Sequence, residues 1–90
     1  MRESNFKEKT LNDLRSKIDE IDNKLITLLD KRGQIAQKIG MIKKDLGLEI
    51  YQPERENIII ERIVALSKVF NESSIRSIWK KIIASCKSIQ

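Results

Sequence analysis

The sequence has 90 residues, of which 40% are hydrophobic and 34% charged, and this composition predicts one globular domain over residues 1–90, not a disordered chain. The single cysteine excludes an intrachain disulfide, and the lack of histidine argues against a zinc site. With no apolar run long enough for a membrane span or a signal peptide, we expect a cytoplasmic protein, and the formal net charge of +5 suits nucleic acid, an acidic membrane or an anionic small molecule.

The first predicted helix runs from about Glu8 to about Asp45, after a flexible tail over residues 1–7. Its seam positions alternate in steps of three and four, the heptad pattern of a coiled coil, and all but position 32 are apolar. The apolar seam residues are Leu11, Leu14, Ile18, Ile21, Leu25, Leu28, Ile35, Ile39, Ile42 and Leu46. Such a helix is roughly 55 Å long, whereas a compact chain of this size has a radius of gyration of about 12 Å. We therefore expect a second copy of the chain to cover the seam in a homodimer.

Two shorter helices are predicted to follow. Pro53 suits the first position of a helix, and Glu54 and Glu56 complement the positive end of its dipole. The segment from Asn71 to Ser74 offers N-cap residues for the last helix. Its apolar stripe consists of Ile75, Ile78, Trp79, Ile82, Ile83 and Cys86, and Gln90 continues it. The sequence thus predicts an all-α fold with one long and two shorter helices, assembled as an intertwined helical homodimer.

Three glycines are spaced by sevens along the long helix and its end. Gly47 fits a helix C-terminal cap. Gly33 and Gly40 lie within the helix, where each costs roughly 1 kcal/mol relative to alanine. We expect another backbone to approach the helix closely at these two positions.

One cation, Arg32, interrupts the apolar seam, and two others, Arg15 and Lys43, belong to a stripe spaced by sevens beside it. Arg32 lies in the seam, and Lys43 follows close to three whole turns later, roughly 16 Å along the axis on the same side. The two side chains bracket a gap suited to a small anion. Arg15 lies about 25 Å from Arg32 along the helix, so only an antiparallel partner chain could bring it to the same ligand. A snorkelling arginine or a buried ion pair is the alternative interpretation of Arg32.

The order and spacing of four segments resemble the all-helical, type II chorismate mutases over about Leu11 to Gln90. The segments are LNDLRSKIDEIDNKLITLLDKR, IGMIKK, PERE and IWKKIIASCKSIQ. The resemblance implies a cofactor-free isomerase that converts chorismate to prephenate by a 3,3-sigmatropic (Claisen) rearrangement in phenylalanine and tyrosine biosynthesis. It also implies a homodimer with shared active sites.

The resemblance implies roles for the cations of the long helix and for Gln90. Arg15, donated across the dimer, and Arg32 are similar to the arginines that bind the two substrate carboxylates. Lys43 resembles the lysine that hydrogen-bonds the ether oxygen and a carboxylate, and Gln90 matches the glutamine that donates to the ether oxygen. Taken without the resemblance, Gln90 equally suits a frayed polar terminus.

The remaining site residues lie in the two shorter helices or, in the case of Gln52, directly before the first of them. Arg55 and Glu56 match the Arg-Glu pair of the family, in which the glutamate takes the substrate hydroxyl; taken alone, they also suit a solvated first turn. Gln52 stands where many members have an aspartate. Cys86 stands where many have a serine that helps to hold the ring carboxylate, although a small core residue is the ordinary role for such a cysteine. The implied catalytic residues are Lys43, Gln90, Arg32 and Glu56.

Three alternatives stay open from the sequence. An isochorismate pyruvate-lyase of the same fold would use the same cations. A non-enzymatic basic coiled-coil dimer that binds nucleic acid is compatible with the charge and the heptads, although its cations would be expected on an open face. A mutase domain within, or acting beside, a larger aromatic-pathway enzyme is the third.

Overall fold

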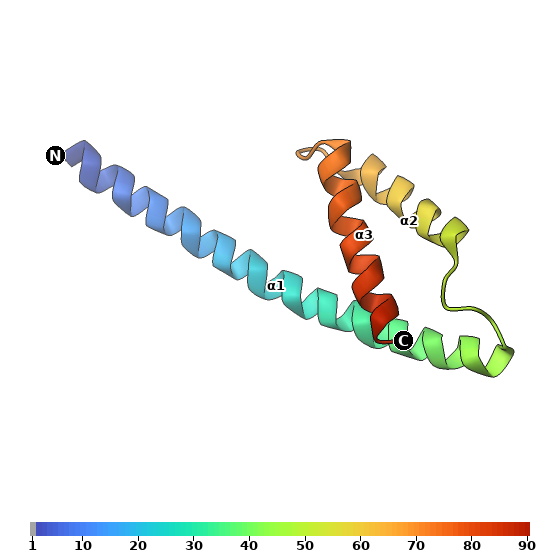
Figure 1. Cartoon of the computed structure of the whole chain (residues 1–90). Helices are drawn as coiled ribbons and strands as arrows, with labels where there is room; N and C mark the ends of the chain where they lie inside the picture. The colour runs from blue at the N-terminus through green and yellow to red at the C-terminus, as the bar shows by residue number, and fades with distance from the viewer. Residues whose placement is uncertain (1) are drawn as a thin grey trace. The chain divides into compact units, whose positions relative to one another are not determined.

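The computed structural model describes residues 2–90 and contains, within that range, three helices and no strand. They are α1 (Arg2–Leu46), α2 (Pro53–Leu66) and α3 (Glu72–Ser88) (Figure 1). The predicted all-α fold of one long and two shorter helices is confirmed. The chain divides into an N-terminal unit, described from residue 2 to 31, and a C-terminal unit of residues 32–90. None of the described helices is long and apolar enough to cross a membrane.

The start of α1 differs from the prediction. The helix begins at Arg2, so the predicted start near Glu8 was wrong. Of the predicted tail over residues 1–7, residues 2–7 are helical, and residue 1 lies outside the described residues. Residues 2–7 contain neither glycine nor proline, and Glu3 in the first turn complements the positive end of the helix dipole. The sequence therefore has no signal that would delay the helix until Glu8.

The end of α1 is a Schellman cap at Gly47. This glycine has a φ of +70°, a conformation that residues with a Cβ rarely adopt. The N–H of Leu48 donates to the carbonyl of Lys43 at 2.8 Å, and the N–H of Gly47 donates to that of Lys44 at 3.2 Å. The predicted cap is confirmed, and it turns the chain into a short linker, residues 47–52, that leads to α2.

Helices α2 and α3 follow one another through a short turn and pack side by side (Figure 1). The Asn71 side chain caps α3 by accepting a hydrogen bond from the N–H of Ser74 at 2.8 Å. Arg76 of α3 pairs with Glu72 and with Glu61 of α2, both at 2.6 Å, and these contacts, that with Glu72 foremost, raise the pKa of the Arg76 guanidinium. The predicted boundaries at Pro53 and Asn71 are confirmed.

The buried residues of α1 are small and all lie in the C-terminal unit: Gly33, Ala36 and Gly40. A Cβ placed on Gly40 would lie 2.9 Å from the Cβ and 3.2 Å from the Cα of Gln90, so backbone does approach closely there, as expected. At Gly33 the neighbour is the Cδ1 atom of Ile89 at 3.2 Å, a side-chain atom instead of backbone. The small residues thus let the segment that follows α3 settle onto α1.

The N-terminal unit has no buried residue among those described. Its predicted seam residues are all large, and between 46% and 59% of each is exposed. They are Leu11, Leu14, Ile18, Ile21, Leu25 and Leu28. Such a continuous apolar stripe in water is unfavourable for a lone chain.

Candidate active site

A pocket of about 420 Å³ lies wholly within the C-terminal unit, a volume that suits a small organic ligand. Its wall comes from the last turns of α1, the linker, α2, α3 and the residue Gln90 that follows α3. It is lined by Arg32, Ile35, Ala36, Ile39, Lys43, Ile50, Gln52, Arg55, Glu56, Ile59, Arg62, Trp79, Ile83, Cys86, Lys87 and Gln90. Half of these side chains are polar, six of them charged and two of them amides, and most of the others are aliphatic.

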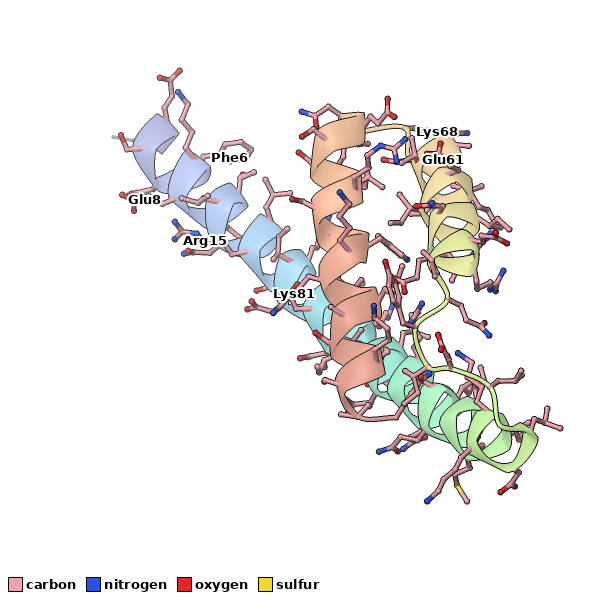
Figure 2. All side chains as sticks on the ribbon, turned by 45° about the vertical axis from the view of Figure 1, so that its right-hand side comes forward. Phe6, Glu8, Arg15, Glu61, Lys68 and Lys81 are labelled. Atoms are coloured by element: carbon pink, nitrogen blue, oxygen red, sulfur yellow. The ribbon has the colours of Figure 1, made fainter. Side chains whose placement is uncertain are left out.

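The pocket brings together all but one of the residues that the resemblance pointed to. Those that line it are Arg32, Lys43, Gln52, Arg55, Glu56, Cys86 and Gln90. Arg15 is not among the lining residues; it is an exposed side chain of α1 in the N-terminal unit (Figure 2). The site as seen in one chain therefore lacks one of the two arginines expected to bind carboxylates.

The charge of the pocket is strongly positive. Five cationic side chains and one carboxylate, that of Glu56, face a partly apolar cavity. Four of the cations make no ion pair with any of the residues 2–90: Arg32, Lys43, Arg55 and Arg62. Unpaired cations against low-dielectric walls favour a ligand that carries more than one negative charge.

Lys43 stands at the border between α1 and the linker. It is half-buried, in the last turn of α1, and its Nζ donates to the carbonyl of Ile50 at 3.3 Å. An ammonium has three donors, so this contact leaves others for a ligand. The same hydrogen bond holds the linker against the end of α1, and Lys43 is thereby fixed at the rim of the pocket.

Gln90 carries an unsatisfied polar group. Its N–H donates to the carbonyl of Lys87 at 3.2 Å, one turn back, and its backbone and Cβ rest on Gly40. The Oε1 atom is buried and has no hydrogen-bond partner within residues 2–90. Leaving such a group unpaired costs roughly 1–3 kcal/mol, which a polar ligand atom would relieve. A half-turn of the amide presents its NH₂ group in the same place, so the side chain is suited to donate to a ligand oxygen.

Glu56 and Lys87 form an ion pair inside the pocket. The Lys87 Nζ lies 3.0 Å from Oε2 and 3.3 Å from Oε1 of Glu56. It also lies 4.6 Å from the centre of the Tyr51 ring, a cation–π distance. Glu56 is therefore more than a solvated residue of a first helical turn.

At two other pocket positions, 86 and 52, this chain has a residue different from the one that many family members have. Cys86 is buried and is a free thiol, so it is both a core residue and part of the pocket wall. Gln52 precedes α2 and makes no side-chain cap hydrogen bond, so its amide is not committed to the helix end.

Among the lining residues that sequence analysis did not assign to the site are Arg62, Trp79 and Lys87. For two of them, the sequence contains a pattern that could have placed them in the site. Arg62 lies seven residues, close to two turns, after Arg55, so both point from the same face of α2. Trp79 belongs to the predicted apolar stripe of α3, the stripe that also carries the predicted site residue Cys86. Lys87 carried no such signal, because its partner Glu56 is remote in the sequence.

Comparison with known proteins agrees with this geometry. Residues 14–90 match the family model for chorismate mutase type II. A bifunctional chorismate mutase/prephenate dehydratase of Aquifex aeolicus is 39% identical over 85 residues, which are 89% of this chain and 24% of that protein. A chorismate mutase of Methanocaldococcus jannaschii is 46% identical over 61 residues, 68% of this chain and 62% of that protein. The chain thus spans less than two thirds of either curated relative.

A solved structure gives the same picture for the fold. Chorismate mutase from Thermus thermophilus, in its form II, has a TM-score of 0.86 and 29% sequence identity, over 88% of this chain and 91% of that chain. With the family match extending from the first half of α1 through α3, sequence and fold point to one assignment. The chain belongs to the chorismate mutase type II family.

Proposed function

We propose that the protein converts chorismate to prephenate. The observation that carries the proposal is the pocket itself, in which five cations and the unsatisfied Gln90 amide surround a space of about 420 Å³ with a single carboxylate. Chorismate is a compact dianion with one hydroxyl group and one ether oxygen, and each of these groups has a counterpart in that set. The names of the Aquifex and Methanocaldococcus relatives support the same activity and a role in aromatic amino acid biosynthesis.

The rearrangement requires a folded substrate more than it requires reactive side chains. One C–O bond breaks while one C–C bond forms within the same molecule, so no nucleophile or proton transfer takes part. Holding both carboxylates fixes the side chain of the substrate over its ring, which supplies the orientation on which the rate depends. Arg32 is proposed to bind one carboxylate by a bidentate pair, and Arg15 of a second copy the other.

Negative charge grows on the ether oxygen as the C–O bond lengthens. Lys43 and Gln90 are proposed to donate to this oxygen, an interaction that is stronger in the transition state than in the substrate. Arg55 and Cys86 would assist in holding a carboxylate. Glu56 would accept the substrate hydroxyl.

The homodimer is part of the proposal. The exposed seam of the N-terminal unit needs a cover, and Arg15 stands outside the pocket formed by its own chain. A second copy in antiparallel orientation would bury the seam and bring its Arg15 to the pocket. The cations of the proposed site line a pocket and not an open face, so we propose neither nucleic acid nor membrane as a partner. We also propose that the protein is located in the cytoplasm.

The decisive experiment combines turnover with mixing of two inactive variants. The unmutated protein is incubated with chorismate, loss of the diene absorbance is followed, and the product is identified by chromatography. Arg15→Ala and Arg32→Ala are each expected to be inactive. After the two variants are unfolded together and refolded, half of the dimers are mixed, and each mixed dimer holds one intact site, so about one quarter of the original activity should return.

The possible outcomes separate the parts of the proposal. Recovery on mixing requires that Arg15 and Arg32 act from different chains. Absence of recovery, with dimers present, would refute the shared site. Turnover of isochorismate with release of pyruvate, and none of chorismate, would replace the mutase with the lyase.

A further inference from the structure

Lys87 differs from every other cation of the pocket because its charge is already matched. It projects from α3 onto the Glu56 carboxylate of α2, with both side chains largely withdrawn from solvent, 31% and 23% exposed. Its Nζ contacts both carboxylate oxygens. Arg32, Lys43, Arg55 and Arg62 have no such partner among the described residues. Lys87 is thus the cation least available to an incoming anion.

The Glu56 carboxylate poses a problem for a dianionic substrate. It is the sole acidic side chain lining the pocket, and like charges brought together in a half-buried site repel strongly. A bare carboxylate there would weaken substrate binding even while it accepted the hydroxyl. An adjacent ammonium removes most of this repulsion and leaves lone pairs on both oxygens for a hydroxyl donor.

Lys87 also connects three parts of the pocket wall. Its ammonium lies over the Tyr51 ring of the linker, and its carbonyl accepts the hydrogen bond from the N–H of Gln90. The side chain is therefore held from the linker and from α2 at once. A lysine restrained in this way keeps the carboxylate in a single orientation.

We propose that Lys87 is a positioning residue of this active site. It orients the Glu56 carboxylate toward the substrate hydroxyl and offsets the negative charge of that carboxylate, so that a dianionic substrate can bind. The inference rests on the proposed mutase activity. It adds to the pocket a residue that acts through Glu56 and does not itself contact the reacting atoms.

The test is a double-mutant cycle between Lys87 and Glu56. Lys87→Met keeps the length of the side chain and removes its charge. We expect KM for chorismate to rise about tenfold or more, with a smaller change in kcat, because repulsion acts on the bound dianion whether or not it reacts. Lys87→Arg should restore KM to near its original value. In the Glu56→Gln background, Lys87→Met should raise KM clearly less, because no carboxylate is left for Lys87 to orient and only its own attraction for the dianion is lost.

Lys81→Met serves as the matched control. Lys81 is an exposed lysine of the same helix outside the pocket (Figure 2), so its replacement should alter neither KM nor kcat. Circular dichroism melting of each variant shows whether the fold is retained, and Lys87→Arg covers the case in which Lys87→Met fails to fold.

Each result bears on the inference in a defined way. An unchanged KM in Lys87→Met, or an equal rise in the Glu56→Gln background, would overturn the role of Lys87 and leave the mutase activity in place. Absence of chorismate turnover by the unmutated protein would overturn the proposed function, and this inference with it.

Discussion

Helix α1 and its heptad pattern extend through both units of the chain, yet the units differ in what α1 packs against. In the N-terminal unit the seam consists of leucine and isoleucine, and no described residue is buried. In the C-terminal unit a second face of α1 carries Gly33, Ala36 and Gly40, which are all buried, and the two glycines lie against the residues that follow α3. Small residues thus mark the face that the chain covers by itself. Large residues mark the face for which the chain supplies no cover.

The largest effect should come from a charge placed in the uncovered seam. Ile21 is 53% exposed within one chain, so Ile21→Lys would leave the folded C-terminal unit unaffected. In a dimer the same lysine would be buried against apolar side chains without a partner, at a cost of several kcal/mol. We expect a monomer in sedimentation velocity and loss of nearly all turnover.

Asn23→Lys is the control for the seam variant, because it adds the same charge on the opposite face of the same helix turns. It should preserve both the dimer and the activity. If Ile21→Lys also stayed dimeric and active, the N-terminal unit would not be an interface, and the contrast between the two units would have to be explained in another way.

The next effect concerns the pocket of the C-terminal unit. With Gln90→Glu, the introduced carboxyl can donate to the ether oxygen only while it is protonated, and its anion would repel that oxygen. At neutral pH kcat should fall by about 100-fold, the scale of losing one such donor. Activity should return as the pH is lowered and the carboxyl is protonated.

The measurement is the pH profile of kcat/KM for this variant beside that of the unmutated protein. The ratio of the two should approach one toward acid and fall steadily toward neutrality. A ratio that does not change with pH would remove Gln90 from the stabilisation of the ether oxygen.

Local signals in the sequence predicted most of the fold. Pro53 favours the first position of a helix and marks the start of α2, and the Asn71 side chain caps the start of α3. Gly47 adopts the positive φ that ends α1. The start of α1 could not be predicted in this way, because Ser4 and Asn5 are typical N-cap residues and yet the helix runs through both of them from Arg2.

The candidate site divides in the same way. The residues named by resemblance do line one pocket, apart from Arg15, and their roles stay predictions. Lys87 was missed because its ion pair joins positions that only the packing of α2 on α3 brings together. Spacing within one helix reports which residues share a face, but it does not report which face of another helix they meet.

The smallest predicted effect distinguishes the two buried glycines of α1. A Cβ at position 40 would meet the Cβ and Cα atoms of Gln90, at 2.9 and 3.2 Å, and neither can move unless the whole residue shifts. A Cβ at position 33 would meet the terminal methyl of Ile89 at 3.2 Å, which a small side-chain rotation relieves. In both variants alanine favours the helix by about 1 kcal/mol relative to glycine.

Gly40→Ala should therefore lower kcat by about tenfold through displacement of the Gln90 amide, since even small misplacements of a catalytic group are costly. Gly33→Ala should keep its activity and melt at an equal or higher temperature. Steady-state kinetics and thermal melting of the two variants side by side provide the measurement. Equal activity of both would mean that the close approach at Gly40 serves packing alone, whereas a selective loss in Gly40→Ala ties the small face of the C-terminal unit directly to the placement of Gln90.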